Sequence, residues 1–324
     1  MLKAGVLGAG HLGKIHLKLL NQSTKYDLVG FYDVNPEAAA AIEAEFGYKR
    51  FDTMEALIAA CDMVDVVTPT IYHFECAEKV VKAGKHLFIE KPITHTVEEA
   101  EKLRDLAKEY GVRGQVGQVE RFNPAFMAVS HMIDKPMFIE AHRLAEFNPR
   151  GTDVSVVLDL MIHDLDAILS VVKSEVKHVH ASGVSVISET PDIANARIEF
   201  ENGCVANLTA SRISMKKMRK ARFFQKDAYI SVDFLDKKCE VVKMKDAPQT
   251  PDDFAMILTN AEGVKKQIYF DNPNVDANNA ILDELESFAD AIANDRTPVV
   301  SLAQGTKALT VAMQIIENFN TIKM

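Results

Sequence analysis

The sequence contains no hydrophobic run that approaches the roughly 20 residues of a membrane-spanning helix. It also lacks an excess of lysine and arginine, because its 324 residues carry a formal net charge of -9 at pH 7. A protein of this charge has no overall attraction to nucleic acid or to anionic membranes, so neither is expected as a partner. An anionic ligand would have to be held by a local cluster of arginines.

Cysteine is scarce, and the four cysteines show none of the spacings that are typical of zinc sites or redox motifs. Each lies in apolar or strand-like sequence: Cys61, Cys76, Cys204 and Cys239. We therefore expect reduced core thiols in a cytoplasmic protein. A first strand that begins at about residue 2 leaves no room for a signal peptide, which agrees with that location.

The first 120 residues alternate between strand and helix patterns. Residues 2–7 form an apolar strand pattern, and apolar residues at helical spacing follow it. Further strands are expected at 27–33 and 65–68, each followed by a helix that ends at a glycine, Gly47 or Gly84. Strands separated by helices indicate a parallel sheet with right-handed crossovers. Residues 1–120 are thus predicted to form one doubly wound domain of the Rossmann type.

The pattern changes after residue 120. A helix is expected around residues 155–172, and alternating strand patterns then lie on both sides of Asn202-Gly203, a strong hairpin signal. The last 45 or so residues return to helix. We expect residues 121–324 to form a C-terminal α/β domain with a large, mostly antiparallel open sheet for substrate binding and oligomerisation. Its terminal helices could pack back on the first domain.

A GxGxxG fingerprint lies between the first strand and the first helix. Its glycines allow a tight turn, close approach of a pyrophosphate and close packing of the helix, whose N-terminal amides face the phosphates. The residues expected to contact the cofactor here are Gly8, Gly10, His11, Leu12 and Gly13. A glycine-rich turn without a ligand is the alternative, and the strand and helix around the motif disfavour it.

Asp33 closes the second predicted strand, twenty residues beyond Gly13. A carboxylate at this point accepts hydrogen bonds from the adenosine ribose hydroxyls and repels a 2′-phosphate. No arginine follows it directly, so NAD is favoured over NADP. The alternative is a loop carboxylate or helix cap, but Asn35 before Pro36 already supplies a capping residue.

Two further motifs carry candidate chemistry. Glu90-Lys91-Pro92 ends an apolar run, which places a lysine at the mouth of the nucleotide-binding sheet. Asp159, His163 and Asp166 have the i, i+4, i+7 spacing of one helix face, where a carboxylate can orient an imidazole for proton transfer. A solvated or salt-bridged polar face is the competing interpretation. A metal site is disfavoured because no other ligand cluster is visible, so no metal is expected.

These motifs together resemble the family named for glucose–fructose oxidoreductase, inositol dehydrogenase and the rhizopine-catabolism protein (Gfo/Idh/MocA). The matching elements follow one another along nearly the whole chain: the GxGxxG motif, Thr68-Pro69-Thr70 with His73, Glu90-Lys91-Pro92, and Asp159 with His163 and Asp166. The resemblance implies NAD(P)-dependent oxidation or reduction of a sugar-like alcohol without a metal. It also implies a homodimer or homotetramer that assembles through the C-terminal sheet.

By the same resemblance, Lys91 and His163 would contact the reacting hydroxyl, with Asp159 assisting or orienting. Lysine can act as the base only with a lowered pKa; otherwise it polarises the oxygen and His163 moves the proton. Thr68, Pro69 and His73 would line the nicotinamide side of the site, and Glu90 and Lys91 would also contact the cofactor. His73 as an ordinary residue at a helix N-terminus remains an equal alternative.

The segment Arg121-Phe122-Asn123-Pro124 is similar to members that oxidise the 3-hydroxyl of UDP-N-acetylglucosamine-type sugars, and residues 157–166 resemble the same branch. Arg121, Asn123, Arg150 and Asp166 are therefore candidate substrate residues, with Arg143 as a further candidate for a diphosphate. Asn123 could instead only cap a helix that begins at Pro124.

The sequence favours an NAD-dependent oxidoreductase that acts on a hydroxyl carbon of a sugar, polyol or nucleotide sugar. Two other classes of function share these motifs. One is a non-catalytic NAD-binding sensor or regulator, which would not need the intact set of Lys91, Asp159 and His163. The other is an NAD-using, redox-neutral glycoside hydrolase, which would release a sugar without net formation of NADH.

Overall fold

Short apolar segments of the N-terminal sequence form a parallel five-stranded sheet in the computed structural model, which describes residues 1–148, 154–248 and 256–323. The strands are β1 (Leu2–Leu7), β2 (Tyr26–Tyr32), β3 (Met63–Val66), β4 (His86–Glu90) and β5 (Gly114–Gly117). Their order is β2-β1-β3-β4-β5, and all neighbouring strands run parallel. The predicted doubly wound sheet is confirmed.

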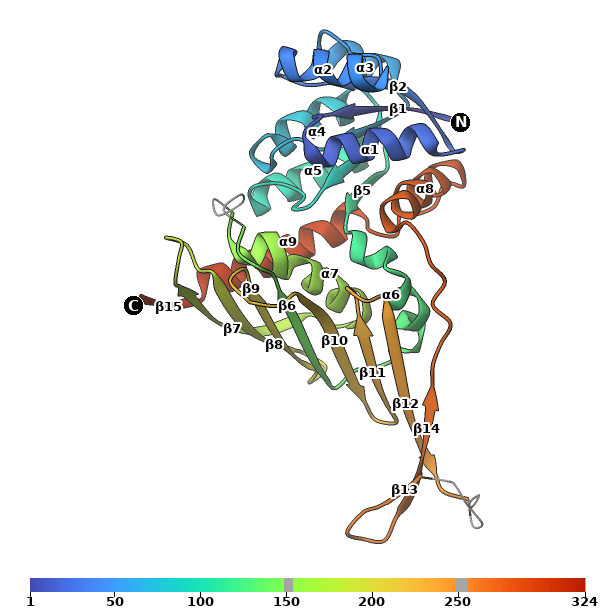
Figure 1. Ribbon diagram of the computed structural model, residues 1–324, viewed down its shortest axis with the longest axis vertical. Helices are drawn as coiled ribbons and strands as arrows, with labels where there is room; N and C mark the ends of the chain where they lie inside the picture. Colours follow the sequence, from blue (N-terminus) through green and yellow to red (C-terminus); the bar gives the residue numbers. More distant parts are fainter. Residues whose placement is uncertain (149–153, 249–255, 324) are drawn as a thin grey trace. The chain divides into compact units, whose positions relative to one another are not determined.

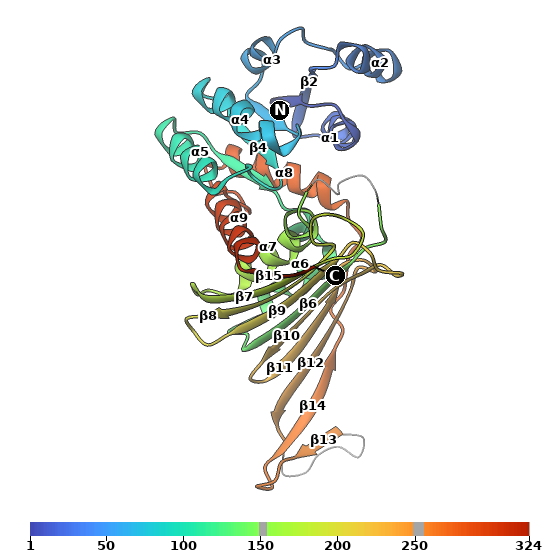
Figure 2. The ribbon, with the colours of Figure 1, turned by 90° about the vertical axis from the view of Figure 1, so that its left-hand side faces the viewer.

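This sheet belongs to the first of two compact units, which comprises Met1–Phe122 and Asn279–Thr310. The helices of unit 1 are α1 (His11–Gln22), α2 (Pro36–Phe46), α3 (Met54–Ala60), α4 (His73–Lys82), α5 (Val97–Glu109) and α8 (Ala280–Ala293). Figure 2 shows α1 and α2 on one side of the sheet and α4 and α5 on the other. Leu285 and Phe288 of α8 share a buried core with Leu17 and Leu20 of α1.

Local sequence signals explain where these helices begin and end. The Asn35 side chain accepts hydrogen bonds from two first-turn amides of α2, and Gly47 ends that helix with a left-handed φ of 72°. Thr96 and Glu99 form the capping box that begins α5. These signals depend on residues a few positions apart, and they place the loops at the carboxyl end of the sheet.

Unit 2 comprises Asn123–Asn278 and Val311–Met324, and it contains a ten-stranded sheet. Its strands are β6 (Phe138–Leu144), β7 (Val176–Ser185), β8 (Ile193–Phe200), β9 (Val205–Ser211), β10 (Met218–Gln225), β11 (Ala228–Asp233), β12 (Lys238–Asp246), β13 (Met256–Thr259), β14 (Lys265–Asp271) and β15 (Phe319–Lys323). The order is β13-β14-β12-β11-β10-β6-β9-β8-β7-β15. Only the β6–β9 and β15–β7 pairs are parallel, so the predicted mostly antiparallel sheet is confirmed.

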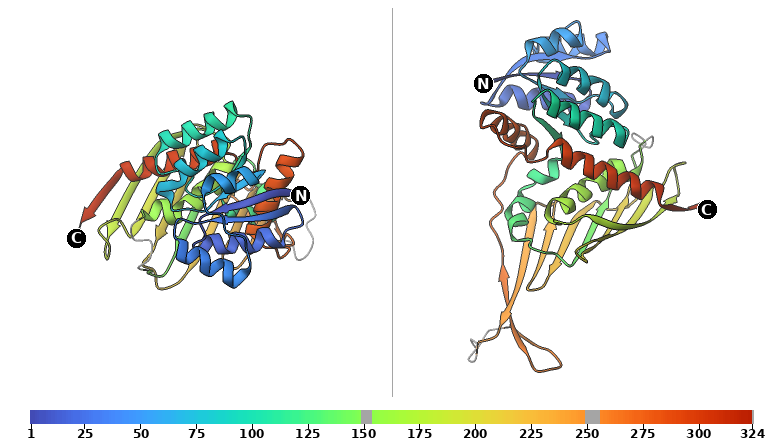
Figure 3. Two further views of the ribbon diagram at one scale, coloured as in Figure 1. Left: turned by 90° about the horizontal axis from the view of Figure 1, so that it is seen from above. Right: turned by 180° about the vertical axis from the view of Figure 1, so that it is seen from behind.

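One face of this sheet is covered by helices of the same unit (Figure 1). They are α6 (Pro124–Val129), a π-helical turn (Val157–Met161), α7 (Ile162–Val171) and the second half of α9 (Leu302–Glu317). Strand residues alternate accordingly: Ala194, Ala196 and Ile198 are buried, whereas Asn195 and Arg197 are exposed. Figure 3 shows how β13 and β14 extend beyond the rest of the unit.

The predicted hairpin is confirmed, and the cysteines lie in the core as predicted. Gly203 adopts a φ of 84° in the turn that joins the antiparallel strands β8 and β9. All four cysteines are buried and free, and burial raises the pKa of Cys61 to about 12 and that of Cys204 to about 11. Among the helices of the described ranges, none is both long and apolar enough to cross a bilayer.

Candidate active site

The carboxyl ends of β1 to β4 border a cleft of about 800 Å³ within unit 1. The strand order reverses at β1, which lies between β2 and β3, and ligands of open α/β sheets bind at such a switch point. Ten of the expected cofactor residues line the cleft: Gly8, Gly10, His11, Leu12, Asp33, Thr68, Pro69, His73, Glu90 and Lys91. The structure therefore brings together residues from four loops.

The glycine-rich turn has the shape that a dinucleotide requires. A Cβ on Gly13 would lie 2.1 Å from the carbonyl oxygen of Gly8, so only glycine lets α1 pack this close to the turn. Gly10 is the N-cap residue of α1 and offers no side chain to its first-turn amides. No atom lies within 4 Å of a Cβ built on Gly10, so a pyrophosphate has room there.

Asp33 joins the end of β2 to this turn. One carboxylate oxygen accepts a hydrogen bond from the Ala9 amide at 2.7 Å, and the other accepts one from the Asn35 amide at 2.9 Å. The side chain is thereby held at the edge of the cleft, where a ribose would meet it. The residues present fit NAD.

His73 ties together two loops of the cleft. Its side chain is buried, with Nδ1 2.9 Å from the Pro92 carbonyl oxygen and Nε2 2.8 Å from the Thr68 carbonyl oxygen. Burial lowers the pKa of His73, although both carbonyl groups oppose that shift. His73 therefore has a structural role at the start of α4, while it also lines the cleft.

The Asp159-His163-Asp166 segment lies in unit 2, and its helix differs from the expected one. A π-helical turn carries Asp159, and α7 begins only at Ile162. The uniform α-helix that was expected around residues 155–172 is thus wrong at its start. Single π-helical turns are frequent at functional sites, because they shift the side chains that flank them. Asp159 and His163 are partly exposed, whereas Asp166 is 3% exposed.

Arg143 has a different role from the diphosphate contact that was expected of it. Its side chain is 3% exposed, and its guanidinium donates to the equally buried carboxylate of Asp164 through Nε and Nη2, the shortest distance being 2.7 Å. The pair connects β6 to α7, the helix that carries His163. The expected contact of Arg143 with a diphosphate is corrected, because this guanidinium is buried inside unit 2 and paired with Asp164.

The remaining substrate candidates differ in their placement. Asn123 is 5% exposed; its amide oxygen accepts from Ala125 N of α6, and its amide nitrogen donates to the Phe234 carbonyl. This confirms the capping interpretation. Arg121 is partly exposed in unit 1 and donates to the Val299 carbonyl at 3.3 Å. Arg150 lies outside the described residues.

Sequence reasoning missed several residues of the cleft. They are Leu7, Tyr32, Val34, Met54, Val67, Thr70, Tyr72, Glu75 and Cys76. Most of them directly adjoin a residue that was predicted. These residues could therefore have been found from their position at a strand end, but not from their side-chain chemistry.

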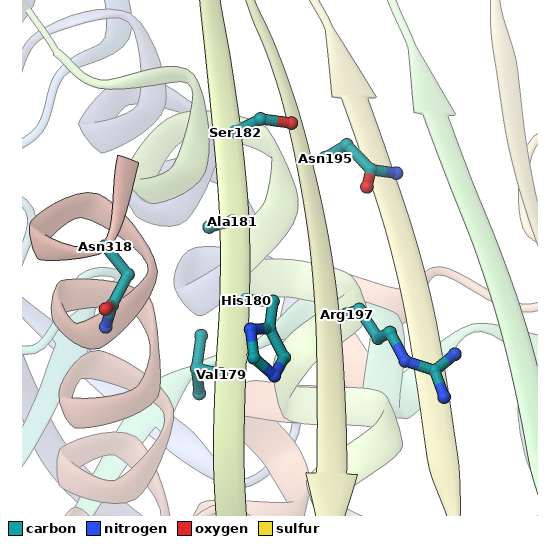
Figure 4. Close-up of a pocket in the computed structure, with 7 residues that line it drawn as sticks. All are labelled: Val179, His180, Ala181, Ser182, Asn195, Arg197 and Asn318. Atoms are coloured by element: carbon teal, nitrogen blue, oxygen red, sulfur yellow. The ribbon is translucent and has the colours of Figure 1, made fainter. Parts of the chain in front are cut away.

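A second hollow, of about 290 Å³, lies on unit 2 and is polar (Figure 4). Its lining residues are Val179, His180, Ala181, Ser182, Asn195, Arg197 and Asn318. His180, Asn195 and Arg197 stand on the neighbouring strands β7 and β8. None of the expected site residues lines it. Within the described ranges, no three His, Cys, Asp or Glu side chains gather as a metal ion would require.

Comparison with known proteins identifies two matched segments. Residues 2–118 match a family of oxidoreductases with an NAD-binding Rossmann fold, and residues 107–242 match the GFO/IDH/MocA C-terminal domain. The two matches together cover most of the chain.

Individual relatives match over nearly the full length. The UDP-N-acetylglucosamine 3-dehydrogenase of Acidithiobacillus ferrooxidans is 36% identical over 97% of this chain and 96% of its own. A solved structure of that enzyme superimposes with a TM-score of 0.88 over 98% of this chain and 97% of its own, at 34% identity. The NAD-dependent scyllo-inositol 2-dehydrogenase of Bacillus subtilis is 27% identical over 98% of this chain and 94% of its own.

Proposed function

The chain belongs to the Gfo/Idh/MocA family of NAD-dependent oxidoreductases that act on CH–OH groups, and we propose that its substrate is a UDP-linked N-acetylhexosamine oxidised at C3. The full-length similarity to UDP-N-acetylglucosamine 3-dehydrogenase supports this substrate. One observation carries the redox assignment: Lys91 lines the same cleft as the glycine-rich turn and Asp33.

The proposed chemistry assigns one role to each of three residues. Lys91 contacts the reacting hydroxyl, His163 takes part in the proton transfer, and Asp159 orients His163. If the pKa of Lys91 is lowered in the complex, Lys91 takes the hydroxyl proton; otherwise its ammonium polarises the oxygen and His163 is the base. Arg121, Arg150 and Asp166 are proposed to hold the nucleotide-sugar substrate.

The glycine-rich turn and Asp33 would hold NAD with its pyrophosphate at α1, and Thr68, Pro69 and Glu90 would border its nicotinamide. NAD, when bound, accepts the hydride that leaves the hydroxyl carbon. The chain's own residues supply what remains, which is orientation of the alcohol and removal of its proton.

The proposal is tested by adding UDP-N-acetylglucosamine, UDP-N-acetylgalactosamine, inositols and free hexoses to the protein with NAD. We expect NADH, followed by its absorbance, to form with the UDP-linked sugars and not with the free hexoses. Bound NAD with no response to any compound would favour a sensor or a redox-neutral hydrolase. A protein that binds no dinucleotide would overturn the proposal altogether.

Replacing Asp33 by alanine should weaken NAD binding. The ribose would lose an acceptor that is charged, and such a hydrogen bond contributes about 1.5–3 kcal/mol, so KM for NAD should rise about 10- to 100-fold. The preference for NAD over NADP should narrow, because repulsion of the 2′-phosphate is lost. Asp27→Ala, an exposed carboxylate on the same strand, is the control. An unchanged cofactor preference in Asp33→Ala would contradict this role.

We further propose that the protein is a homodimer or homotetramer assembled through unit 2. In the described part of unit 2, the helices pack on one face of the sheet, and Met256, Leu258 and Phe270 of β13 and β14 expose apolar side chains. Exposed apolar groups of this kind are typical of interfaces. Light scattering at micromolar concentration should give at least twice the mass of one chain, and Phe270→Asp should lower it. A monomeric wild-type protein would refute the proposal.

A further inference from the structure

A buried histidine lies between two carboxylates beneath the end of β4. His16 of α1 and Asp65 of β3 have fully buried side chains, and the histidine Nδ1 is 2.7 Å from Asp65 Oδ2. The other ring nitrogen, Nε2, is 3.3 Å from Oε1 of Glu90, whose side chain is 13% exposed. Nδ1 is thus hydrogen-bonded to Asp65, whereas Nε2 lies within ion-pair distance of Glu90 without the geometry of a hydrogen bond.

This arrangement favours a positive charge on the ring. A neutral imidazole can donate from Nδ1 to Asp65 but carries no charge to attract Glu90, whereas the imidazolium attracts both carboxylates. Burial opposes a charge on His16, yet Asp65 and then Glu90 outweigh it and raise its pKa well above the ordinary value. Burial also raises the pKa of Asp65, but the second carboxylate, at Nε2, favours the proton on the ring.

The Glu90 carboxylate links this buried pair to the cleft. Its Oε2 accepts a hydrogen bond from the main-chain amide of Lys91 at 3.1 Å. On the side of β5 it packs against Gly117, where a Cβ would lie only 2.6 Å from Oε1. His16, the Lys91 amide and Gly117 therefore fix the carboxylate from three directions.

We propose that His16 is a positioning residue: as an imidazolium anchored by Asp65, it holds the Glu90 carboxylate and so fixes the main chain that presents Lys91 to the cleft. The inference rests on the proposed function, in which Lys91 contacts the reacting hydroxyl. A buried pair that only stabilised the fold would not need the third member, Glu90, at the edge of the cleft.

Four variants test the coupling, with His131→Asn, an exposed histidine of unit 2, as the matched control. His16→Asn and Asp65→Asn should each lower kcat about 10- to 100-fold through misplacement of Lys91, with little change in KM for NAD. Their affinity for NADH, measured by fluorescence without any turnover, should be nearly unchanged. Glu90→Gln should have a similar effect, and the double variant His16→Asn/Glu90→Gln should be no worse than either single variant.

The pH dependence follows from the raised pKa of His16. The contact is complete while the ring is charged and is lost as the pH rises through that raised pKa, so kcat and stability should both decline on the alkaline side. Tyr26 of β2 is a further titratable neighbour, because burial and then Asp65 raise its pKa, and Glu286 and Asp290 of α8 raise it as well. In folded His16→Asn, the decline of kcat and stability at alkaline pH should differ from that of the wild-type protein. In Glu286→Gln, the same decline should persist.

A measurement on the wild-type protein needs no variant to fold. Neutron diffraction at neutral pH should show hydrogen on both ring nitrogens of His16; hydrogen on only one would overturn the inference. Unchanged kcat in folded His16→Asn would also overturn it and leave the proposed function standing. Absence of any sugar oxidation by the wild-type protein would instead remove the proposed function, and the positioning role with it, whatever the charge of His16.

Discussion

Lys91→Met should lower kcat about 10²- to 10⁴-fold, the usual contribution of a group that assists proton transfer. Methionine retains much of the length of the side chain and removes its charge, so the cleft should keep its shape. NADH affinity, measured by fluorescence titration, should change little, because the glycine-rich turn and Asp33 are untouched. Lys108→Met, an exposed lysine on α5 of the same unit, is the control.

His163→Asn is the companion variant, with a similar loss of kcat expected. Rescue of Lys91→Ala by small alkylamines then distinguishes the two mechanisms. If the rescue rate rises with the basicity of the amine, Lys91 takes the proton; if it does not, Lys91 polarises the oxygen and His163 is the base. Retained turnover in both Lys91→Met and His163→Asn would remove the assigned chemistry.

The parts of the fold that were predictable from sequence depend on residues close together in the chain. The glycine-rich turn, the Asn35 cap, the Thr96–Glu99 capping box and the Asn202-Gly203 hairpin each involve residues within a few positions of one another. Side-chain periodicity also placed the parallel strands and the antiparallel sheet. The position of the cleft was predictable from these strands, because the loops at the carboxyl ends of a parallel sheet meet at one edge.

The features that escaped prediction are contacts between distant positions. His16 and Asp65 are 49 residues apart, and Arg143 and Asp164 are 21 apart. A signal was nevertheless available, since Asp65 is the one charged residue in the apolar segment Met63–Val66 and His16 lies on the apolar face of α1. The π-helical turn at Asp159 left no such signal, because the same residues are compatible with an α-helix.

The second large effect is expected from Arg143→Met, which should destabilise the protein by about 3–5 kcal/mol because it leaves the Asp164 carboxylate buried without this partner. Total stabilities are typically only about 5–15 kcal/mol, so the loss should be evident as a lower midpoint in urea unfolding. Sugar oxidation should also fall, since Asp164 directly follows His163 and its ion pair connects α7 to β6.

The double variant Arg143→Met/Asp164→Leu separates the buried charge from the general loss of packing. Replacing both members of a buried pair by apolar residues is often neutral or stabilising, so this variant should recover most of the lost stability. Arg104→Met removes an arginine whose side chain is 41% exposed from its pair with Asp105, and should cost at most about 1 kcal/mol. Equal effects of Arg143→Met and Arg104→Met would show that burial of the Arg143–Asp164 pair does not govern the stability of unit 2.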